Sequence, residues 1–288
     1  MGEKIDLLQV IKSIKDMKQK IKTIKDSHLT IGFVPTMGAL HEGHLSLVRN
    51  AKKEHDEVVV SIFVNPLQFG KNEDLRHYPR TFDRDCELLS REGVNLVFYP
   101  DITEIYPDGF CTSVIVHDLE DKLCGKTRPG HFRGVAVVVL KLFHLIKPDS
   151  AYFGQKDFQQ TVIIKRMVYD LNLDINVKVL PTIRNTEGLA LSSRNVYLTE
   201  TEKKDALCLY QSLVKAQCMA TSGITDTEKI IREMKKIIHT CASATIDYIS
   251  IVNPETLEIT SEVRNGNVVT LAIRIGRTRL IDNVILTF

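Results

Sequence analysis

The sequence carries little net charge and has no long apolar run. Its 38 basic and 36 acidic residues leave a net charge of +2, whereas proteins that bind DNA or RNA usually carry a clustered basic face. Nowhere does the chain have the eighteen or so uninterrupted apolar residues of a membrane span. These absences argue against a nucleic-acid partner and against a membrane protein. The 43% hydrophobic and 26% charged residues are typical of a folded globular chain.

Cysteine is also scarce. The six cysteines are scattered and no two of them form a C-x-x-C pair, so their spacing indicates neither a zinc site nor a disulfide framework. A signal peptide is not indicated either, because the first 25 residues contain seven lysines and no unbroken apolar core. By elimination, we expect the chain in a reducing cytoplasm.

The 288 residues suffice for one large domain or two moderate ones. From residue 29 to residue 180, apolar runs of strand length alternate with stretches of helical pattern. Strands are predicted at 29–34, 57–65, 95–99, 112–117, 151–153 and 175–180, and helices from after residue 38 to about 55 and at 80–92, 131–146 and 157–171. This alternation implies right-handed βαβ units and a parallel sheet, in which the near-continuous apolar runs are buried on both faces.

The lysine-rich N-terminus is predicted to form an amphipathic helix over residues 4–25. Its apolar face consists of residues spaced three and four apart, while the lysines fill the other face: Leu7, Val10, Ile14, Met17, Ile21 and Ile24. We favour packing of this helix on the sheet, with a basic helix lying on a membrane surface as the alternative.

The pattern changes after residue 185. Two helices are predicted at 199–220 and 226–241, followed by strands at 246–252, 268–275 and 280–287. Helices followed by strands indicate a smaller α+β domain whose strands are antiparallel. We place the boundary near 184–190, which divides the chain into domains of residues 1–184 and 185–288.

The segment His41-Glu42-Gly43-His44 stands where a strand is predicted to turn into a helix. It differs from the H-E-x-x-H motif of zinc proteases, whose histidines lie four apart in mid-helix. Free N–H groups and the dipole favour an anion at a helix N-terminus, and Gly43 would let a phosphate or a flat base approach the backbone. The segment therefore predicts a nucleotide-phosphate site, with two helix-capping histidines as the structural alternative.

Two further segments carry phosphate-binding chemistry. Leu191-Ser192-Ser193-Arg194-Asn195 offers two hydroxyls and a guanidinium to polyphosphate oxygens, although Ser-Ser-Arg also occurs in ordinary surface loops. Phe153-Gly154-Gln155-Lys156-Asp157 runs from a strand into a helix. Lys156 could neutralise charge on a phosphate, and Asp157 could bind ribose hydroxyls or cap the helix. No G-x-x-x-x-G-K-[ST] run is present, so the chain is not a P-loop protein.

Together these segments resemble the nucleotidylyltransferase superfamily, in which an H-x-G-H segment and a K-M-S-K-S-like loop share one ATP. Here Leu191 stands where Met is often found, and the lysines of that loop are absent, so Arg194 supplies its charge. The resemblance narrows to the pantothenate synthetase family through residues 34–44 (VPTMGALHEGH), 63–70 (FVNPLQFG), 131–135 (HFRGV), 152–160, 189–197 and, more weakly, 278–283 (TRLIDN). Gln155 is a departure, since many relatives have Glu there.

This resemblance implies a Rossmann-like N-terminal domain, a smaller C-terminal lid and a homodimer. It implies ATP, pantoate and β-alanine as substrates, with Mg²⁺ accompanying ATP, unknown protein ligands for the metal, and Asp85 as a candidate contact. The implied catalytic residues are His41 as proton donor, His44 and Lys156. The implied ATP site consists of Val34, Pro35, Thr36, Met37, Gly38, Ala39, Leu40, His41, Gly154, Gln155, Lys156, Asp157, Ile183, Leu191, Ser192, Ser193 and Arg194. The implied substrate-binding residues are Asn65, Gln68 and Gln160.

Neutral amides suit the substrate that this resemblance implies. The carboxylate of pantoate must attack the α-phosphate of ATP, and an arginine on that carboxylate would draw off the charge that the attack requires. Asn65 and Gln68 follow directly from a predicted buried strand, where ligands gather in open α/β sheets. Outside this context, each would be an ordinary loop amide.

The expected reaction has two halves. Pantoate first forms pantoyl adenylate and pyrophosphate, and β-alanine then attacks the adenylate, giving pantothenate and AMP. The alternatives are an adenylyltransferase of the same superfamily that stops after the first step, and an ATP-binding regulatory module without turnover. A tRNA synthetase is disfavoured by the near-neutral charge.

Overall fold

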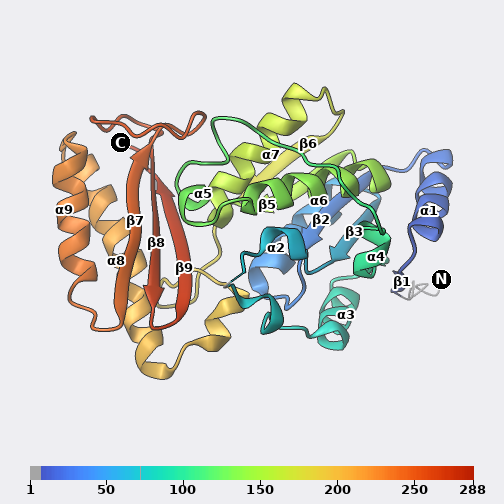
Figure 1. The fold of residues 1–288 in the computed structure, drawn as a ribbon, viewed down its shortest axis with the longest axis horizontal. Coiled ribbons are helices and arrows are strands. Elements are labelled where there is room, and N and C mark those ends of the chain that lie inside the picture. The colour runs from blue at the N-terminus through green and yellow to red at the C-terminus, as the bar shows by residue number, and fades with distance from the viewer. Residues whose placement is uncertain (1–7, 72) are drawn as a thin grey trace.

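The computed structural model describes residues 8–71 and 73–288. It contains a six-stranded parallel sheet and a three-stranded antiparallel sheet that lie side by side (Figure 1). The order in the parallel sheet is β1 (Gln9–Ile11), β4 (Leu96–Phe98), β3 (Glu57–Ile62), β2 (Ile31–Thr36), β5 (Ser150–Gly154) and β6 (Asn176–Leu180). Each neighbouring pair is parallel, so the predicted α/β class is confirmed.

Helices cover both faces of the parallel sheet. One face carries α2 (Glu42–Glu54) and α3 (Phe82–Arg91), and the other carries α1 (Ile14–Asp26), α6 (His131–Ile146) and α7 (Phe158–Asp170). Val58 and Val60 of β3 belong to the apolar cluster of the first face, whereas Val59 belongs to that of the second. Successive side chains of a strand point to opposite faces, so a strand covered on both sides must be apolar throughout, as predicted.

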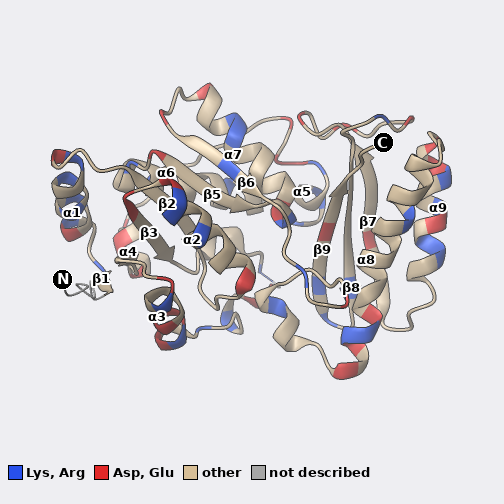
Figure 2. Cartoon of the chain, turned by 180° about the vertical axis from the view of Figure 1, so that it is seen from behind, with Lys and Arg blue, Asp and Glu red and all other residues tan. Residues whose placement is uncertain are grey.

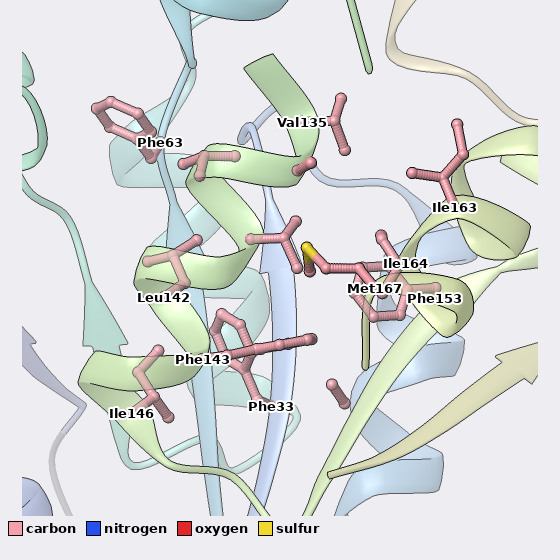
Figure 3. Packing of buried hydrophobic residues seen from close by; sticks show 14 of the residues in the cluster. Phe33, Phe63, Val135, Leu142, Phe143, Ile146, Phe153, Ile163, Ile164 and Met167 are labelled. Carbon is pink, nitrogen blue, oxygen red and sulfur yellow. The ribbon is translucent and has the colours of Figure 1, made fainter. Parts of the chain in front are cut away.

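Aromatic rings occupy the centre of the larger cluster (Figure 3). Phe143 of α6 packs edge-to-face against Phe33 of β2 and Phe153 of β5, with ring centroids 6.4 Å apart in both pairs. Met167 of α7 lies beside them (Figure 3). These contacts hold α6 across β2 and β5, whose carboxyl ends carry candidate site residues.

The N-terminal helix is shorter than predicted. Ser13 caps α1, because its hydroxyl accepts a hydrogen bond from the backbone N–H of Asp16 (3.1 Å). Before it, β1 pairs with β4 at the edge of the sheet, so the predicted helix over 4–25 is wrong for residues 8–13, and residues 4–7 lie outside the described part. The apolar face of α1 is buried in the larger cluster, which supports packing on the sheet over a membrane-surface helix.

The strand predicted at 112–117 is absent among the described residues. The segment runs as irregular chain, with Val116 buried in the larger cluster and its neighbours largely exposed. Its run of consecutive β-branched residues fits a strand, but β1 already occupies the edge of β4, so no pairing partner is available there. The strand predicted as buried at 175–180 is present as β6, but it is a partly exposed edge strand.

Short helices make up the remaining elements of the N-terminal part, and the sequence patterns did not indicate them. They are α4 (Ile102–Ile105), α5 (Cys124–Thr127) and the 3-10 turns η1 (Pro66–Gln68), η2 (Asp74–Arg76) and η3 (Gln155–Asp157). A further 3-10 turn, η4 (Ser193–Tyr197), leads toward the C-terminal part.

The C-terminal part agrees with its predicted order. Helices α8 (Glu200–Thr221) and α9 (Thr227–Ile238) precede the antiparallel strands β7 (Ala244–Val252), β8 (Val268–Ile275) and β9 (Thr278–Ile285). The two helices pack on one face of the sheet (Figure 1). On the other side, Val252, Leu257 and Val268 join the apolar cluster of the parallel sheet, so the two sheets are joined by apolar contact.

Charged side chains are spread over the surface helices (Figure 2). Lys and Arg are mixed with Asp and Glu along α3 and α9 and in the first turns of α8, which agrees with the balanced composition. Within residues 8–71 and 73–288, no helix has the length and apolar character needed to cross a membrane.

Candidate active site

The candidate site lies where four neighbouring parallel strands end. Residues 37–41 follow β2, η1 follows β3, η3 follows β5, and residues 181–183 follow β6. From β2 the chain continues to β3 on one side, whereas β5 lies on its other side. Ligands in open α/β sheets bind at such a reversal of strand order, outside the carboxyl ends of the strands.

Two histidines cap the N-terminus of α2. The Nδ1 atom of His41 accepts a hydrogen bond from the backbone N–H of Gly43 (3.1 Å), and the Nδ1 atom of His44 accepts one from the N–H of His41 (3.3 Å). A neutral imidazole that accepts at Nδ1 carries its proton on Nε2. The capping alternative is therefore correct, and it leaves each histidine an Nε2–H donor beside the cavity that both rings line.

Both imidazoles are uncharged at neutral pH. Burial, and after it the charge of Lys156, lowers the pKa of His41 to about 4. Burial, followed by the charges of His41 and Lys156, holds the pKa of His44 well below its ordinary value. Bound triphosphate would raise both values, because an anion favours the protonated form.

Gly43 has a local role that the sequence did not indicate. A Cβ atom there would lie 2.9 Å from the Cε1 and Nδ1 atoms of His41. The absent side chain thus makes room for the capping imidazole, and the glycine also lines the cavity.

The turn before α2 is held by a buried carboxylate. Gly38 and Ala39 both have positive φ angles (80° and 51°), which is costly for alanine. Asp85 of α3, only 1% exposed, accepts hydrogen bonds from the backbone N–H groups of Ala39 (2.8 Å) and Leu40 (2.9 Å) and from the hydroxyl of Thr81 (3.0 Å). Both oxygens of Asp85 therefore accept hydrogen bonds within the protein, which argues against the expectation that this carboxylate contacts magnesium.

The Ser-Ser-Arg loop reaches this turn from far along the chain. The hydroxyl of Ser193 donates a hydrogen bond to the carbonyl of Ala39 (3.0 Å), across 154 residues. Ser192 caps η4 by accepting from the N–H of Arg194. The guanidinium of Arg194 binds both oxygens of Asp74 (2.9 and 2.8 Å). The loop and the histidine turn thus share one edge of the cavity.

Lys156 lines the same cavity as the two histidines. Its ammonium lies 3.8 Å from Asp157, whose side chain is half exposed. Asp157 occupies the N-cap position of α7 but makes no side-chain capping bond, so its carboxylate stays available at the cavity edge. This favours the ribose-binding alternative for Asp157 over the capping one.

The side-chain amides of Asn65 and Gln68, which follow β3, differ in how many of their hydrogen-bonding groups are already used. Asn65 is 1% exposed, and its amide is fully used: its oxygen accepts from Leu67 N and Tyr106 Oη, and its nitrogen donates to the Gly134 carbonyl and to Gln68 Oε1. Gln68 also donates to the sulfur of Met37. Asn65 therefore orients Gln68 and has no amide group left for a ligand.

A hydrogen-bond network that the sequence did not indicate holds the backbone of Gln68. Arg128 binds both oxygens of Glu73 (2.7 and 2.6 Å) and donates to Nε2 of His131 (3.0 Å). The Nδ1–H of His131 in turn donates to the Gln68 carbonyl (2.7 Å). Burial first, and then the charge of Arg128, lowers the pKa of His131 to about 4, which fits this neutral tautomer. His131 lies in a segment that carried the family resemblance, but its pattern gave no role.

Gly134, in the same segment, allows the close approach of α6 to η1. A Cβ atom there would collide with the carbonyl of Leu67 and lie 2.7 Å from the N–H of Gln68. Only glycine lets the two backbones meet at this distance.

The cavity brings most of the predicted site residues together. Its lining includes Pro35, Thr36, Met37, His41, His44, Asn65, Gln68, Gly154, Lys156, Asp157, Gln160, Ile183, Leu191, Ser192, Ser193 and Arg194. Val34, Gly38, Ala39, Leu40 and Gln155 are not part of this lining. Val34 and Leu40 are buried in the apolar cluster under α2, and Gln155 bonds to Asn283 instead.

The cavity also has features that the sequence did not reveal. Val135, Val138 and Leu142 of α6 form an apolar wall. Thr182 lines the cavity, and its buried hydroxyl has no hydrogen-bond partner among the described residues. Such a group is expected where a bound ligand supplies the hydrogen bond. The inner cavity, about 220 Å³, adjoins a wider cleft of about 1330 Å³ toward the C-terminal part.

Comparison with known proteins decides the family. A family model described as pantoate-beta-alanine ligase matches residues 9–285. The pantothenate synthetases of Caldicellulosiruptor bescii and Thermotoga petrophila are each 51% identical, over 96% and 97% of this chain and 98% and 100% of their own. The chain belongs to the pantoate–β-alanine ligase family. It is therefore an enzyme, a ligase of pantothenate biosynthesis that uses ATP to join pantoate to β-alanine.

Solved structures agree with this family. Pantothenate synthetase from Thermus thermophilus superimposes with a TM-score of 0.91 at 41% identity, covering 98% of this chain and 100% of that one. The pantoate–β-alanine ligase from Francisella tularensis, solved with "Beta-gamma ATP" and β-alanine, gives 0.81 at 36% identity, covering 96% and 97%. The predicted fold class, with its smaller C-terminal part, is confirmed.

The ligase has no preformed metal cage among its described residues, since no group of three His, Cys, Asp or Glu side chains is placed to hold an ion. Asp85 is enclosed by donors and Asp74 is paired with Arg194. The Asp157 carboxylate lines the cavity and remains half exposed.

Replacing Asp85 tests its assignment as a brace of the turn. Asp85→Asn puts an NH₂ group against a backbone N–H, which leaves a buried donor unsatisfied at a cost of about 1–3 kcal/mol. We expect a lower free energy of unfolding and a higher KM for ATP, with an unchanged dependence on Mg²⁺ concentration. Asp83→Asn, an exposed change on the same helix, is the control. A change in the Mg²⁺ dependence for Asp85→Asn alone would show that this carboxylate does contact the metal.

The buried histidines predict how stability depends on pH. Because the pKa values of His41 and His131 fall from 6.5 to about 4 on folding, the unfolded chain binds more protons between these two pH values. The free energy of unfolding should therefore fall as pH decreases from 6.5 toward 4. His131→Asn keeps an N–H near Nδ1 but cannot titrate, so its decrease over this range should be shallower. Urea titrations at several pH values measure both slopes, and equal slopes would contradict the assignment.

Proposed function

We propose that the enzyme makes its amide bond through a pantoyl adenylate, and that the cavity described above holds both reacting groups. One observation carries this proposal: the two Nε2–H donors of His41 and His44 line the same cavity as Gln68 and Gln160. A phosphate-binding edge and an amide-bearing apolar recess therefore adjoin. An enzyme that transfers adenylate to a small carboxylic acid needs both.

The recess suits pantoate in shape and polarity. Pantoate carries two methyl groups on a quaternary carbon, beside two hydroxyls and a carboxylate. The wall of Val135, Val138 and Leu142 offers apolar surface to the methyl groups. Gln68 is held by its neighbours, and the Gln160 amide makes no hydrogen bond within the described residues. These neutral amides orient the hydroxyls without drawing charge from the carboxylate.

In the first half-reaction, a carboxylate oxygen of pantoate attacks the α-phosphorus of ATP. The bond from that phosphorus to the bridging oxygen of the β-phosphate breaks, and pyrophosphate leaves with the electron pair. The neutral His41 and His44 donate hydrogen bonds, and Lys156 places a positive charge, where negative charge accumulates. His41 carries its proton on Nε2 and donates a hydrogen bond there. The proton-donor role that the family resemblance implies requires the protonated ring, which bound phosphate favours.

The leaving group is held by Ser192, Ser193 and Arg194. The bidentate pair of Arg194 with Asp74 shows the geometry that the guanidinium offers to a phosphate. We propose that phosphate oxygens of ATP take the place of the Asp74 carboxylate. Gly38, Ala39 and Leu40 contribute to the same site through the backbone of the turn, and Val34 lies in β2, the strand that leads into this turn.

In the second half-reaction, the free amine of β-alanine attacks the acyl carbon of the adenylate. The mixed anhydride breaks, AMP leaves, and the nitrogen loses a proton. Water must be kept from the anhydride. The C-terminal part borders the wider cleft at residues of β8 and β9, and this position supports its role as a lid.

Magnesium accompanies ATP in this proposal and neutralises phosphate charge when it is bound. The scarcity of accessible carboxylates supports a metal held mainly by the phosphates, with Asp157 in reach of the nucleotide. We also propose that the chain divides into a Rossmann-like domain at residues 1–184 and a lid at 185–288. Support comes from an apolar cluster that starts at Leu189 and contains only residues of the second part. The family resemblance supports a homodimer in the cytoplasm.

Pyrophosphate exchange tests the order of the two steps. Labelled pyrophosphate should enter ATP when pantoate is present, and β-alanine should not be required, because adenylation precedes amide formation. Exchange that needs β-alanine would contradict the adenylate route.

Replacing Gln68 separates pantoate binding from ATP binding. Gln68→Ala should raise the KM for pantoate by about 10-fold, the effect of hydrogen bonds worth about 1.5 kcal/mol, and leave the KM for ATP nearly unchanged. Gln68→Glu should bind pantoate worse still, because like charges repel in a partly dry site. Gln19→Ala, an exposed change on α1, is the control. An increase confined to the KM for ATP would place Gln68 at the nucleotide instead.

A further inference from the structure

The turn that carries Lys156 is held by a side chain of the C-terminal sheet. Asn283 of β9 donates hydrogen bonds from its amide nitrogen to the carbonyls of Gln155 (2.9 Å) and Lys156 (3.0 Å). Its amide oxygen accepts one from Nε2 of Gln155 (3.1 Å). The NH₂ group of this amide therefore donates hydrogen bonds to two consecutive backbone carbonyls of η3.

The turn η3 has few constraints of its own. It spans three residues and has no side-chain hydrogen bond at its N-cap. Gly154, which precedes it, has no atom near the place that a Cβ would occupy. The ammonium of Lys156 is 3.8 Å from Asp157, an ion pair that is too long to be a hydrogen bond. The contacts from Asn283 are thus the main polar fixation of the turn from outside it.

Asn283 is itself rigidly held. It is 2% exposed, and its backbone N–H donates to Oδ1 of Asp282 (2.8 Å). Asp282 is equally buried and binds Arg184 through both oxygens (2.9 and 2.5 Å). Arg184 stacks on the ring of Tyr210, 4.7 Å from its centroid. The charge of Asp282 is therefore compensated, and the strand delivers the Asn283 amide at a fixed place.

We propose that Asn283 is a positioning residue for adenylation: it fixes the backbone of η3 so that Lys156 points at the α-phosphate. This inference rests on the proposed role of Lys156. It also gives the C-terminal sheet a part in the first half-reaction, beyond covering the cleft. A small displacement of a group that acts on the transition state is costly, on the order of 10²-fold for about 1 Å.

The competing explanation is that Asn283 only stabilises the contact between the two sheets. Asn267 provides a matched control, since it is also a buried asparagine of the C-terminal part (5% exposed). Its side chain accepts a hydrogen bond from the N–H of Arg264, and it lines neither the cavity nor the cleft. Asn267→Ala should lower the thermal midpoint but leave the pyrophosphate exchange rate unchanged.

The central experiment combines Asn283→Ala with Lys156→Ala in the full-length enzyme and measures pyrophosphate exchange with saturating pantoate. Asn283→Ala should lower kcat by about 10- to 100-fold and change the KM for ATP by less than about threefold, because the affected contact forms mainly in the transition state. If Asn283 acts through Lys156, the double variant should be no slower than Lys156→Ala alone.

Asn283→Asp adds a readout that a purely structural role would not produce. Its ionised carboxylate faces two carbonyl oxygens and cannot donate, whereas the protonated acid can donate to one of them. Exchange by this variant, relative to the wild type at the same pH, should therefore rise as pH decreases, while the relative rate of Asn283→Ala stays flat.

The outcomes separate the inference from the function on which it rests. A wild-type rate for Lys156→Ala would overturn the role of Lys156 and the inference with it. A slow Lys156→Ala together with a kcat for Asn283→Ala within twofold of the wild type would overturn the positioning role alone. So would a double variant slowed by the full product of the two single effects. If Asn283→Ala does not fold, the pH response of Asn283→Asp decides, and a flat relative rate rejects the inference.

Discussion

Two uncharged imidazoles at the start of α2 are the constraint on which the site depends. Each gives its Nδ1 lone pair to a backbone N–H of the same turn, so the turn fixes the rings and the rings fix the turn. Burial next to Lys156 keeps both rings neutral, and a neutral ring that accepts at Nδ1 must donate at Nε2. One arrangement therefore determines the tautomer, the charge and the direction of both donors.

The other parts of the site are tied to this turn. Asp85 of α3 accepts hydrogen bonds from its strained backbone, and the hydroxyl of Ser193 donates one to the carbonyl of Ala39. On the far side of the cavity, the C-terminal sheet fixes η3 through Asn283. The cavity is thus walled by segments more than 100 residues apart, and their relative placement comes from the apolar core that both sheets share.

The sequence predicted what depends on local pattern. Apolar runs in β3 and β5 predicted buried parallel strands, and the residues after them predicted a phosphate-binding edge. The sequence patterns failed where the structure depends on which segments pair in the sheet. Residues 9–11 fit a helix pattern but pair with β4 at the sheet edge, and this leaves residues 112–117 without a strand partner. Hydrogen-bond partners were equally hidden. All hydrogen-bonding groups of the Asn65 amide are used within the protein. The sequence pattern also does not indicate the hydrogen bonds from Arg128 to His131 or from Asn283 to η3.

The most direct test of the central constraint is a measurement of the histidine tautomers. Long-range ¹H–¹⁵N NMR spectra of the side chains, assigned with His41→Asn and His44→Asn, report which ring nitrogen carries the proton. At pH 7, both rings should be neutral with the proton on Nε2, and titration should give a pKa for each below the ordinary 6.5. A proton on Nδ1 of either ring, or a pKa at or above 6.5, would contradict this account of the site.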